Sequence, residues 1–263
     1  DRYIIDGKLT QMFLSVRELD KEALDDNAKT WVNQHLKYTH GYGLTMSPVN
    51  KVTSSGQPSM VVRNVPPVSD YKELEVTVPQ VYFGELTNDY VVVNTDEQEF
   101  DYPMGEELQT TKYQGTAGIK LNFLNKVLYS IREGSFKLLV SGGVNSDSKI
   151  IINRNIMDRV NKIAPFLSYD EDPYAVVVNG KIYYIIDGYT TTKYFPYAEP
   201  FNENANYIRN SFKVIVDAYN GDVNYYIVDE KDPLVETYSK IFPKLFKPMS
   251  DMPKEFVSHL RYP

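Results

Sequence analysis

The chain has 263 residues, of which 42% are hydrophobic, a share ample for a packed core. Its 35 acidic and 28 basic residues give a formal net charge of −7, and no basic stripe is interleaved with aromatic residues. Because phosphate contacts need clustered Lys and Arg, nucleic acid is excluded as an expected partner, and docking on an anionic lipid surface is disfavoured. The chain contains no cysteine, which excludes disulfides, thiolate nucleophiles and zinc fingers.

The two ends of the chain do not resemble natural termini. The chain begins with Asp1 rather than Met and stops at Pro263 without a polar tail. No apolar run approaches the roughly 20 residues that a membrane-spanning helix needs. We therefore expect a single domain, residues 1–263, taken from a longer protein, with a hinge between two subdomains near residues 141–147.

The first half of the chain predicts strands and helices separated by one long irregular segment. A β-hairpin with an Asp6-Gly7 turn is predicted at residues 3–16, and a helix at about 27–36 places Trp31 and His35 on one face. Residues 38–69 are rich in Gly, Pro, Ser and Asn without periodicity, which predicts a long functional loop. Further strands are predicted at residues 74–78, 80–83 and 90–94, and helices at 119–132 and 148–163.

The C-terminal third shows the clearest pattern. Two strand pairs flank the dipeptides Asn179-Gly180 and Asn220-Gly221, which favour type I′ turns. Asp232-Pro233 predicts a capped helix that runs to about residue 242, followed by a short helix at about 253–260. The whole pattern predicts a mixed α+β fold in which antiparallel β-hairpins pack with several helices.

Few residues show a pattern typical of known chemistry. The three histidines and the acidic runs lack the spacing of zinc or calcium ligands, so we expect no metal site and no cofactor. No serine-nucleophile motif stands out. Arg209, Asn210 and Lys213 together are able to hold a carboxylate or a phosphate, but internal ion pairs with the surplus carboxylates are the favoured interpretation.

Several longer strings, read together, resemble a known family. They are Trp31-Val-Asn-Gln-His-Leu-Lys-Tyr-Thr-His-Gly-Tyr-Gly, Ser47-Pro-Val-Asn, Tyr82-Phe-Gly-Glu, Glu99-Phe-Asp-Tyr-Pro, Ile163-Ala-Pro-Phe-Leu-Ser-Tyr-Asp-Glu-Asp-Pro-Tyr, Ile186-Asp-Gly-Tyr-Thr-Thr, Asn206-Tyr-Ile-Arg-Asn-Ser and His259-Leu-Arg-Tyr-Pro. They span almost the whole chain in order, and they resemble the uncharacterised protein family (UPF) 0182, which comprises multi-pass bacterial membrane proteins. The resemblance implies an N-terminal transmembrane region outside this chain, which is then a large extracytoplasmic domain at the cell membrane. It implies no established activity.

The resemblance also nominates candidate ligand-binding residues. They are the polar residues within the most family-like strings: His40, Tyr42, Asn50, Glu85, Arg209 and Asn210. No residue is assigned a catalytic role, and the sequence leaves open whether the chain is an enzyme.

Three functions compete at this stage. The favoured one is an extracytoplasmic binding or sensing domain that passes the occupancy of a small polar ligand, or of an envelope protein, to the transmembrane region of the same protein. The alternatives are a structural assembly module of an envelope complex and a cell-envelope hydrolase or transferase. In the last, His40 is the general base, supported by Glu85 or Arg209.

Overall fold

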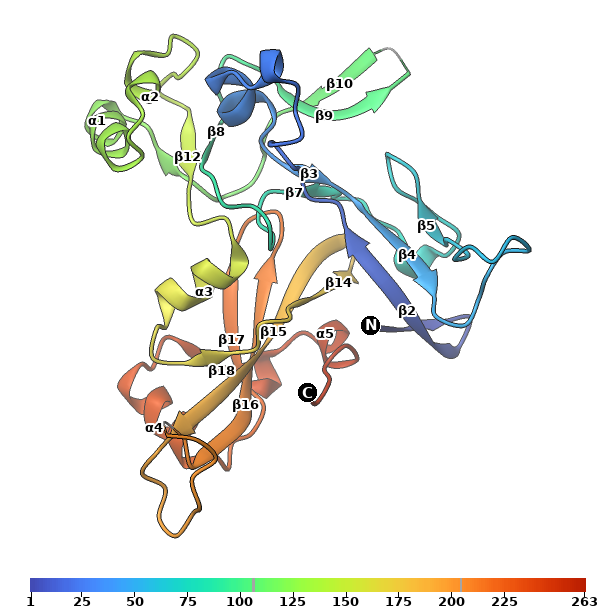
Figure 1. The fold of residues 1–263 in the computed structure, drawn as a ribbon, viewed down its shortest axis with the longest axis vertical. Helices are drawn as coiled ribbons and strands as arrows, with labels where there is room; N and C mark the ends of the chain where they lie inside the picture. The colour runs from blue at the N-terminus through green and yellow to red at the C-terminus, as the bar shows by residue number, and fades with distance from the viewer. Residues whose placement is uncertain (106, 204) are drawn as a thin grey trace.

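The computed structural model describes residues 1–105, 107–203 and 205–263 (Figure 1). It confirms the mixed α+β fold, because antiparallel sheets pack with several helices. The two largest sheets in the described residues have six and five strands. A third region, at the upper left of Figure 1, contains a small sheet with α1 and α2 beside it.

The largest sheet comes from the C-terminal half of the chain. Its strands are β13 (Ser168–Tyr169), β14 (Tyr174–Val178), β15 (Lys181–Thr192), β16 (Tyr207–Asp217), β17 (Val223–Ile227) and β18 (Phe246–Pro248). β13 and β14 pair with successive parts of β15, and the order continues through β16 and β17 to β18. All pairings are antiparallel except that of β17 with β18.

Both faces of this sheet are covered, and the reason lies in the side-chain alternation of β16. Val214 and Val216 pack in one core with α3 (Ile156–Ile163), whereas Ile215 packs in another with Phe256. Successive side chains of a strand point to opposite faces, so a run of β-branched residues predicts a strand buried on both sides. The other helical elements nearby are α4 (Pro233–Ile241), a short 3-10 helix (Met249–Asp251) and α5 (Lys254–Val257).

The two predicted Asn-Gly turns differ from each other. Asn179 and Gly180 have φ of 49° and 76°, which fits the type I′ turn expected between β14 and β15. The type I′ prediction is wrong for the second hairpin, where Gly221 has a positive φ but Asn220 does not. There the Asp217 carboxylate accepts the N–H groups of Tyr219 and Asn220 and forms a wider turn.

The five-stranded sheet is formed by the N-terminal part of the chain, on the right in Figure 1. Its strands are β1 (Arg2–Ile5), β2 (Lys8–Val16), β4 (Leu44–Pro48), β5 (Val62–Arg63) and β6 (Val68–Ser69). The predicted hairpin at residues 3–16 is confirmed. The prediction of a continuous loop at residues 38–69 is wrong in part, because β4 pairs with β2 along its whole length. That pairing is a tertiary contact that local composition does not reveal.

The third region has its own core. It contains β8 (Val91–Val93), β11 (Ile119–Lys120), β12 (Lys149–Ile151), α1 (Phe123–Arg132) and α2 (Phe136–Val140). Two further strand pairs lie nearby, β3 (Gly41–Tyr42) with β7 (Gln80–Val81) and β9 (Glu99–Met104) with β10 (Glu107–Thr111). Leu36, Val92, Leu138 and Ile150 are among the residues that pack this core.

Several predicted helix and strand boundaries are wrong. The helix expected at 27–36 is replaced by a 3-10 helix (Asp26–Ala28) and a turn of π-helix (Asn33–Lys37). The helices expected at 119–132 and 148–163 each begin with a short strand, β11 and β12, which pair with each other. A 3-10 helix (Lys72–Leu74) stands at the start of the strand expected at 74–78. For β11 and β12, the pairing of β12 with both β11 and the distant β8 overrides local periodicity.

The segment at residues 141–147 joins α2 to β12, and the hinge there and the single-domain assignment stay predictions. Within the described residues, no helix has both the length and the apolar character required to cross a membrane.

Candidate functional site

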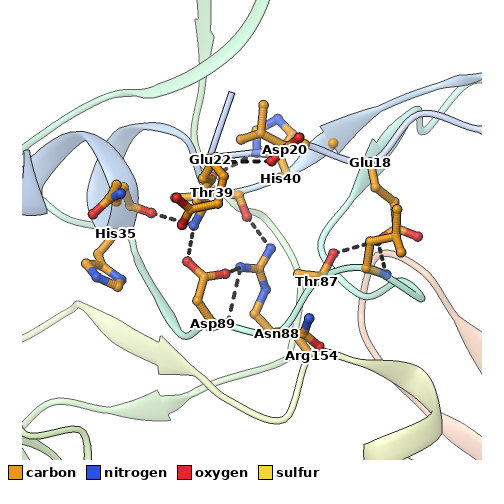
Figure 2. A pocket seen from close by; sticks show the side chains of 15 residues that line it. Glu18, Asp20, Glu22, His35, Thr39, His40, Thr87, Asn88, Asp89 and Arg154 are labelled. Atoms are coloured by element: carbon orange, nitrogen blue, oxygen red, sulfur yellow. Dashed lines mark hydrogen bonds and ion pairs between the residues drawn. The ribbon is translucent and has the colours of Figure 1, made fainter. Parts of the chain in front are cut away.

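A cavity of about 530 Å³ opens where segments distant in the sequence meet (Figure 2). Its walls are residues 18–22, which follow β2, residues 34–41, which include the end of the π-helix, and residues 86–89. Arg154, just after β12, also lines it. The cavity therefore brings together parts of the N-terminal sheet and of the third region.

Arg154 ties these walls together. Its side chain is almost fully buried, and its Nε donates a hydrogen bond to the Tyr82 carbonyl at 2.8 Å. Nη2 donates to the Thr39 carbonyl, and Nη1 lies 3.2 Å from Asp89 Oδ1. A guanidinium stays charged in proteins, so its burial requires such a set of acceptors and a counterion.

Asp89 is shared by two cations. Besides Arg154, its carboxylate pairs with the ammonium of Lys21, which also donates to the Gln34 carbonyl. Burial, followed by repulsion from Arg154, lowers the pKa of Lys21 to about 8, although Asp89 opposes the shift. Lys21 is therefore the amine of this cavity whose charge changes nearest to neutral pH.

Glu18 holds the loop on the opposite wall. Its carboxylate accepts the N–H groups of Glu85 at 2.7 Å and Leu86 at 2.9 Å, and the hydroxyl of Thr87 at 2.7 Å. The hydroxyl of Tyr184, on β15, also donates to it at 3.2 Å. These bonds join the cavity wall to the large sheet.

His40 lies at the end of the cavity in a buried hydrogen-bond network. Thr39 Oγ1 donates to Glu99 Oε2 at 2.5 Å, so its single proton is not available to His40. The 2.8 Å contact between His40 Nδ1 and Thr39 Oγ1 is then donated by the ring. Nε2 lies 3.2 Å from the Asp101 carboxylate, which accepts a second hydrogen bond from the ring. This arrangement holds His40 as an imidazolium.

The electrostatics agree with that protonation state. Burial disfavours the charged ring, but the hydrogen bond to Asp101 and the carboxylate of Glu99, 3.8 Å from Nδ1, outweigh burial and raise the pKa of His40. Burial likewise opposes ionisation of Glu99, yet the nearby charge of His40 and the hydrogen bonds from Thr39 and Tyr82 lower its pKa. An imidazolium that donates from both nitrogens has no lone pair to take a proton, which is unsuited to a general base.

The charges of the lining are unbalanced toward carboxylates. Glu18, Asp20, Glu22 and Asp89 face Arg154, which is always charged, and Lys21, which is mostly charged at neutral pH. His35 adds no charge near neutral pH, because burial lowers its pKa, and it donates from Nδ1 to the Tyr90 carbonyl at 2.8 Å. Asp20 and Glu22 are exposed, and Figure 2 shows them side by side. With the imidazolium of His40 included, the lining still carries a net negative charge.

No cluster of three or more His, Asp or Glu side chains suited to a metal ion is found among residues 1–105, 107–203 and 205–263. The network around His40 has internal hydrogen bonds instead.

Of the six predicted residues, His40 lines the cavity and Glu85 adjoins it through its N–H bond to Glu18. Tyr42, on β3, is half-buried with its ring 5.1 Å from that of Tyr102. Asn50 is exposed and lines a separate depression of about 660 Å³ beside the β1–β2 hairpin. That depression lacks the buried charges of the first cavity.

Arg209 and Asn210 lie on β16, where Arg209 forms an ion pair and Asn210 binds a lysine that forms another. Arg209 pairs with Asp229, and Asn210 Oδ1 accepts from Lys213 Nζ at 2.6 Å. Lys213 in turn pairs with the buried carboxylate of Asp187. The ion-pair interpretation of this cluster is confirmed. The hydrogen bonds and ion pairs of His40 within the described chain go to Thr39, Glu99 and Asp101 rather than to the Glu85 or Arg209 that the hydrolase hypothesis requires.

Sequence reasoning missed most of the charged residues of the site. Glu18, Lys21, Asp89 and Arg154 stand in segments with no recognisable motif. Glu99 could have been nominated from the sequence, because it belongs to one of the family-like strings.

Comparison with known proteins places the chain in a family. The model of an uncharacterised protein family, UPF0182, matches residues 1–263. The chain belongs to this family. It is 57% identical to a UPF0182 protein of Alkaliphilus metalliredigens, and the match covers 100% of this chain but 28% of that protein. A UPF0182 protein of Clostridium acetobutylicum is 53% identical and one of Clostridium botulinum strain Kyoto 54%, with 29% of each covered. No solved structure matches the chain. The chain thus spans less than a third of the length of these family members.

Proposed function

We propose that the chain is a binding domain whose cavity beside Arg154 takes a small polar molecule that carries an amine or another cationic group. The observation that carries this proposal is the surplus of carboxylates around the cavity, four against the three cationic side chains of Lys21, Arg154 and His40. Lys21 and Arg154 are already paired with Asp89, whereas Asp20 and Glu22 are exposed at the edge of the cavity. A cationic ligand is attracted to such an edge, and desolvation inside the cavity strengthens the attraction.

The proposal extends to the setting of the domain. The relatives are more than three times as long as this chain, and the family-like strings resemble multi-pass membrane proteins. We place the domain on the outer side of the cell membrane, where it passes ligand occupancy to a transmembrane region of the same protein. An alkaline phosphatase fused within this domain of the full-length protein is active if this placement holds, and it is inactive if the domain faces the cytoplasm.

Thermal-shift assays test the binding itself. The probes are polyamines, amino sugars and basic amino acids, each with its N-acetylated form, which lacks the positive charge. We expect at least one amine to raise the Tm and its acetylated form to have a much smaller effect. A panel in which no amine raises the Tm at millimolar concentration overturns the proposal.

Matched variants locate the site. Asp20→Asn with Glu22→Gln removes the two exposed carboxylates of the edge, and Glu73→Gln with Glu75→Gln removes two exposed carboxylates elsewhere. The first pair should weaken the amine by about tenfold, because an exposed ligand contact with a charge contributes on the order of 1 kcal/mol. The second pair should leave the affinity unchanged. Equal losses in both pairs would indicate nonspecific attraction to an acidic protein.

A further inference from the structure

Helix α1 exposes its apolar side to solvent, whereas a helix of a folded domain normally buries that side. Its apolar residues lie within an arc of about 140°, at 100° per residue, and that arc faces solvent. Phe123 is 80% exposed, Ile131 74% and Leu124 64%. The one buried residue of α1 is Ser130, whose Oγ has no hydrogen-bond partner within the described chain. In most amphipathic helices the apolar face is buried and the polar face is exposed, which is the reverse of the arrangement in α1.

Helix α2 extends the same apolar surface. Phe136 is 70% exposed and Val140 58%, while Leu138, on the other side of the helix, is buried in the neighbouring core. Figure 1 shows α1 and α2 side by side at the outer edge of the molecule. We call this surface the α1–α2 face; it consists of Phe123, Leu124, Leu128, Ile131, Phe136 and Val140.

The charge around this face is opposite to that of the rest of the chain. Residues 119–140 contain four basic residues and one acidic residue, which is three positive charges. The whole chain carries −7, so the remaining residues carry −10. Lys120, just before α1, and Lys137, on α2, are exposed. The overall acidity, which disfavours docking on anionic lipid, therefore does not extend to this surface.

We propose that the α1–α2 face docks in the interface of an anionic lipid bilayer. Apolar side chains of an interfacial helix enter the boundary between headgroups and acyl chains, and lysines beside them bind the lipid phosphates. The charge complementarity favours this occupant over an uncharged apolar partner. The proposal stands apart from ligand binding at the cavity, because none of its residues lines that site.

Flotation with vesicles tests the proposal. The purified chain is mixed with vesicles of equal parts phosphatidylcholine and phosphatidylglycerol, or of phosphatidylcholine alone, and centrifuged in a sucrose gradient. We expect flotation with the anionic vesicles, weaker flotation with the neutral ones, and loss of the difference at high salt. No flotation, or equal flotation with both vesicles, overturns the proposal.

Variants assign the binding to this face. Phe123→Ser, Leu128→Ser and Ile131→Ser combined should reduce the partition coefficient by about tenfold or more, because each apolar side chain contributes to insertion. Lys120→Gln with Lys137→Gln should reduce it by about tenfold on anionic vesicles. The matched control is Leu9→Ser with Phe13→Ser on β2, where the exposed fractions are 68% and 64%. If the control loses binding and the triple variant keeps it, the proposal is wrong.

Two further measurements separate lipid from other occupants. Because the chain has no cysteine, Phe123→Cys carries a single environment-sensitive fluorophore, whose emission should shift to the blue on anionic vesicles. The emission of the same fluorophore attached at Phe13→Cys should not change on these vesicles. Analytical ultracentrifugation tests for a second copy: a dimer that the triple variant abolishes, with no flotation, would overturn lipid docking.

Discussion

The carboxylate of Glu18 fills the space that a side chain at position 84 would occupy. A Cβ built on Gly84 would lie 2.3 Å from Glu18 Oε2, closer than a Cβ ever approaches another heavy atom in proteins. The same carboxylate holds the following loop through the N–H groups of Glu85 and Leu86. The family-like string Tyr82-Phe-Gly-Glu therefore includes a glycine that lets Glu18 shape one wall of the cavity.

Gly84→Ala should lower the free energy of unfolding by about 1–3 kcal/mol, the usual cost of forcing extra volume into a packed site. Urea unfolding of Gly84→Ala, Glu18→Ala and the double variant forms a cycle that isolates the contact. In the Glu18→Ala background the alanine should cost much less, because the colliding group is gone. Equal costs in both backgrounds would show that the effect does not come from Glu18.

Arg154→Met should destabilise the fold by about 3–5 kcal/mol, because it leaves buried carbonyls and part of the Asp89 charge without a partner. The measurement is again the free energy of unfolding in urea. The matched control is Arg63→Met, whose partner is Asp70 and whose ion pair is nearly half exposed on both sides. That change should cost far less, because solvent screens an exposed ion pair. Similar values for the two variants would contradict the structural role of Arg154.

The pH dependence of His40 has a definite sign. Its pKa is raised above the ordinary 6.5 in the folded chain, so its charged form stabilises the fold fully below that pH. The contribution is lost as the pH rises through the folded pKa. His40→Gln should therefore cost about 1.5–3 kcal/mol at about pH 6, and the difference from the natural chain should shrink at higher pH.

The titration of Lys21 also makes the stability of the fold depend on pH, and its contribution has to be separated from that of His40. Its pKa is lowered to about 8 in the folded chain, from the ordinary 10.5, so the fold gains stability as the pH rises between these values. That sign is opposite to the sign expected for His40. The stability of His40→Gln should be compared with that of the natural chain between about pH 6 and 8, where Lys21 contributes little to the pH dependence. A difference that does not change with pH would show that His40 is neutral.

Local chemistry made some elements predictable. Asp232-Pro233 predicts the start of α4, and the Asp232 carboxylate does accept the N–H groups of Leu234 and Val235. It also accepts hydroxyls from Thr190 and Ser211 on neighbouring strands. The first pair of contacts follows from spacing along the chain, whereas the second depends on how the sheet folds back on α4. Sequence patterns predict contacts between neighbours in the chain, and they do not predict contacts between distant segments.

The cavity belongs to the second kind. Its Asp, Glu, Lys and Arg residues come from positions 18–22, 86–89 and 154, and they meet through the pairing of short strands that show little periodicity. Arg154 follows a strand in a segment that periodicity predicts to be helical. His40 was nominated because it lies in a family-like string, and its partners Glu99 and Asp101 share another such string. The strings indicate important residues without indicating which of them meet.

The amine of Lys21 offers a direct probe of the cavity. Burial and Arg154 lower its pKa to about 8 against the opposing effect of Asp89. Competitive acetylation followed by mass spectrometry should therefore give a labelling midpoint near pH 8 for Lys21, because the free amine is the reactive form. Asp89→Asn removes the group that raises the pKa, so the midpoint should move below that of the natural chain. The matched control, Asp70→Asn, changes a carboxylate paired with Arg63 and should leave the midpoint unchanged. A midpoint near the ordinary 10.5, or one that rises in Asp89→Asn, would contradict a buried amine between Arg154 and Asp89.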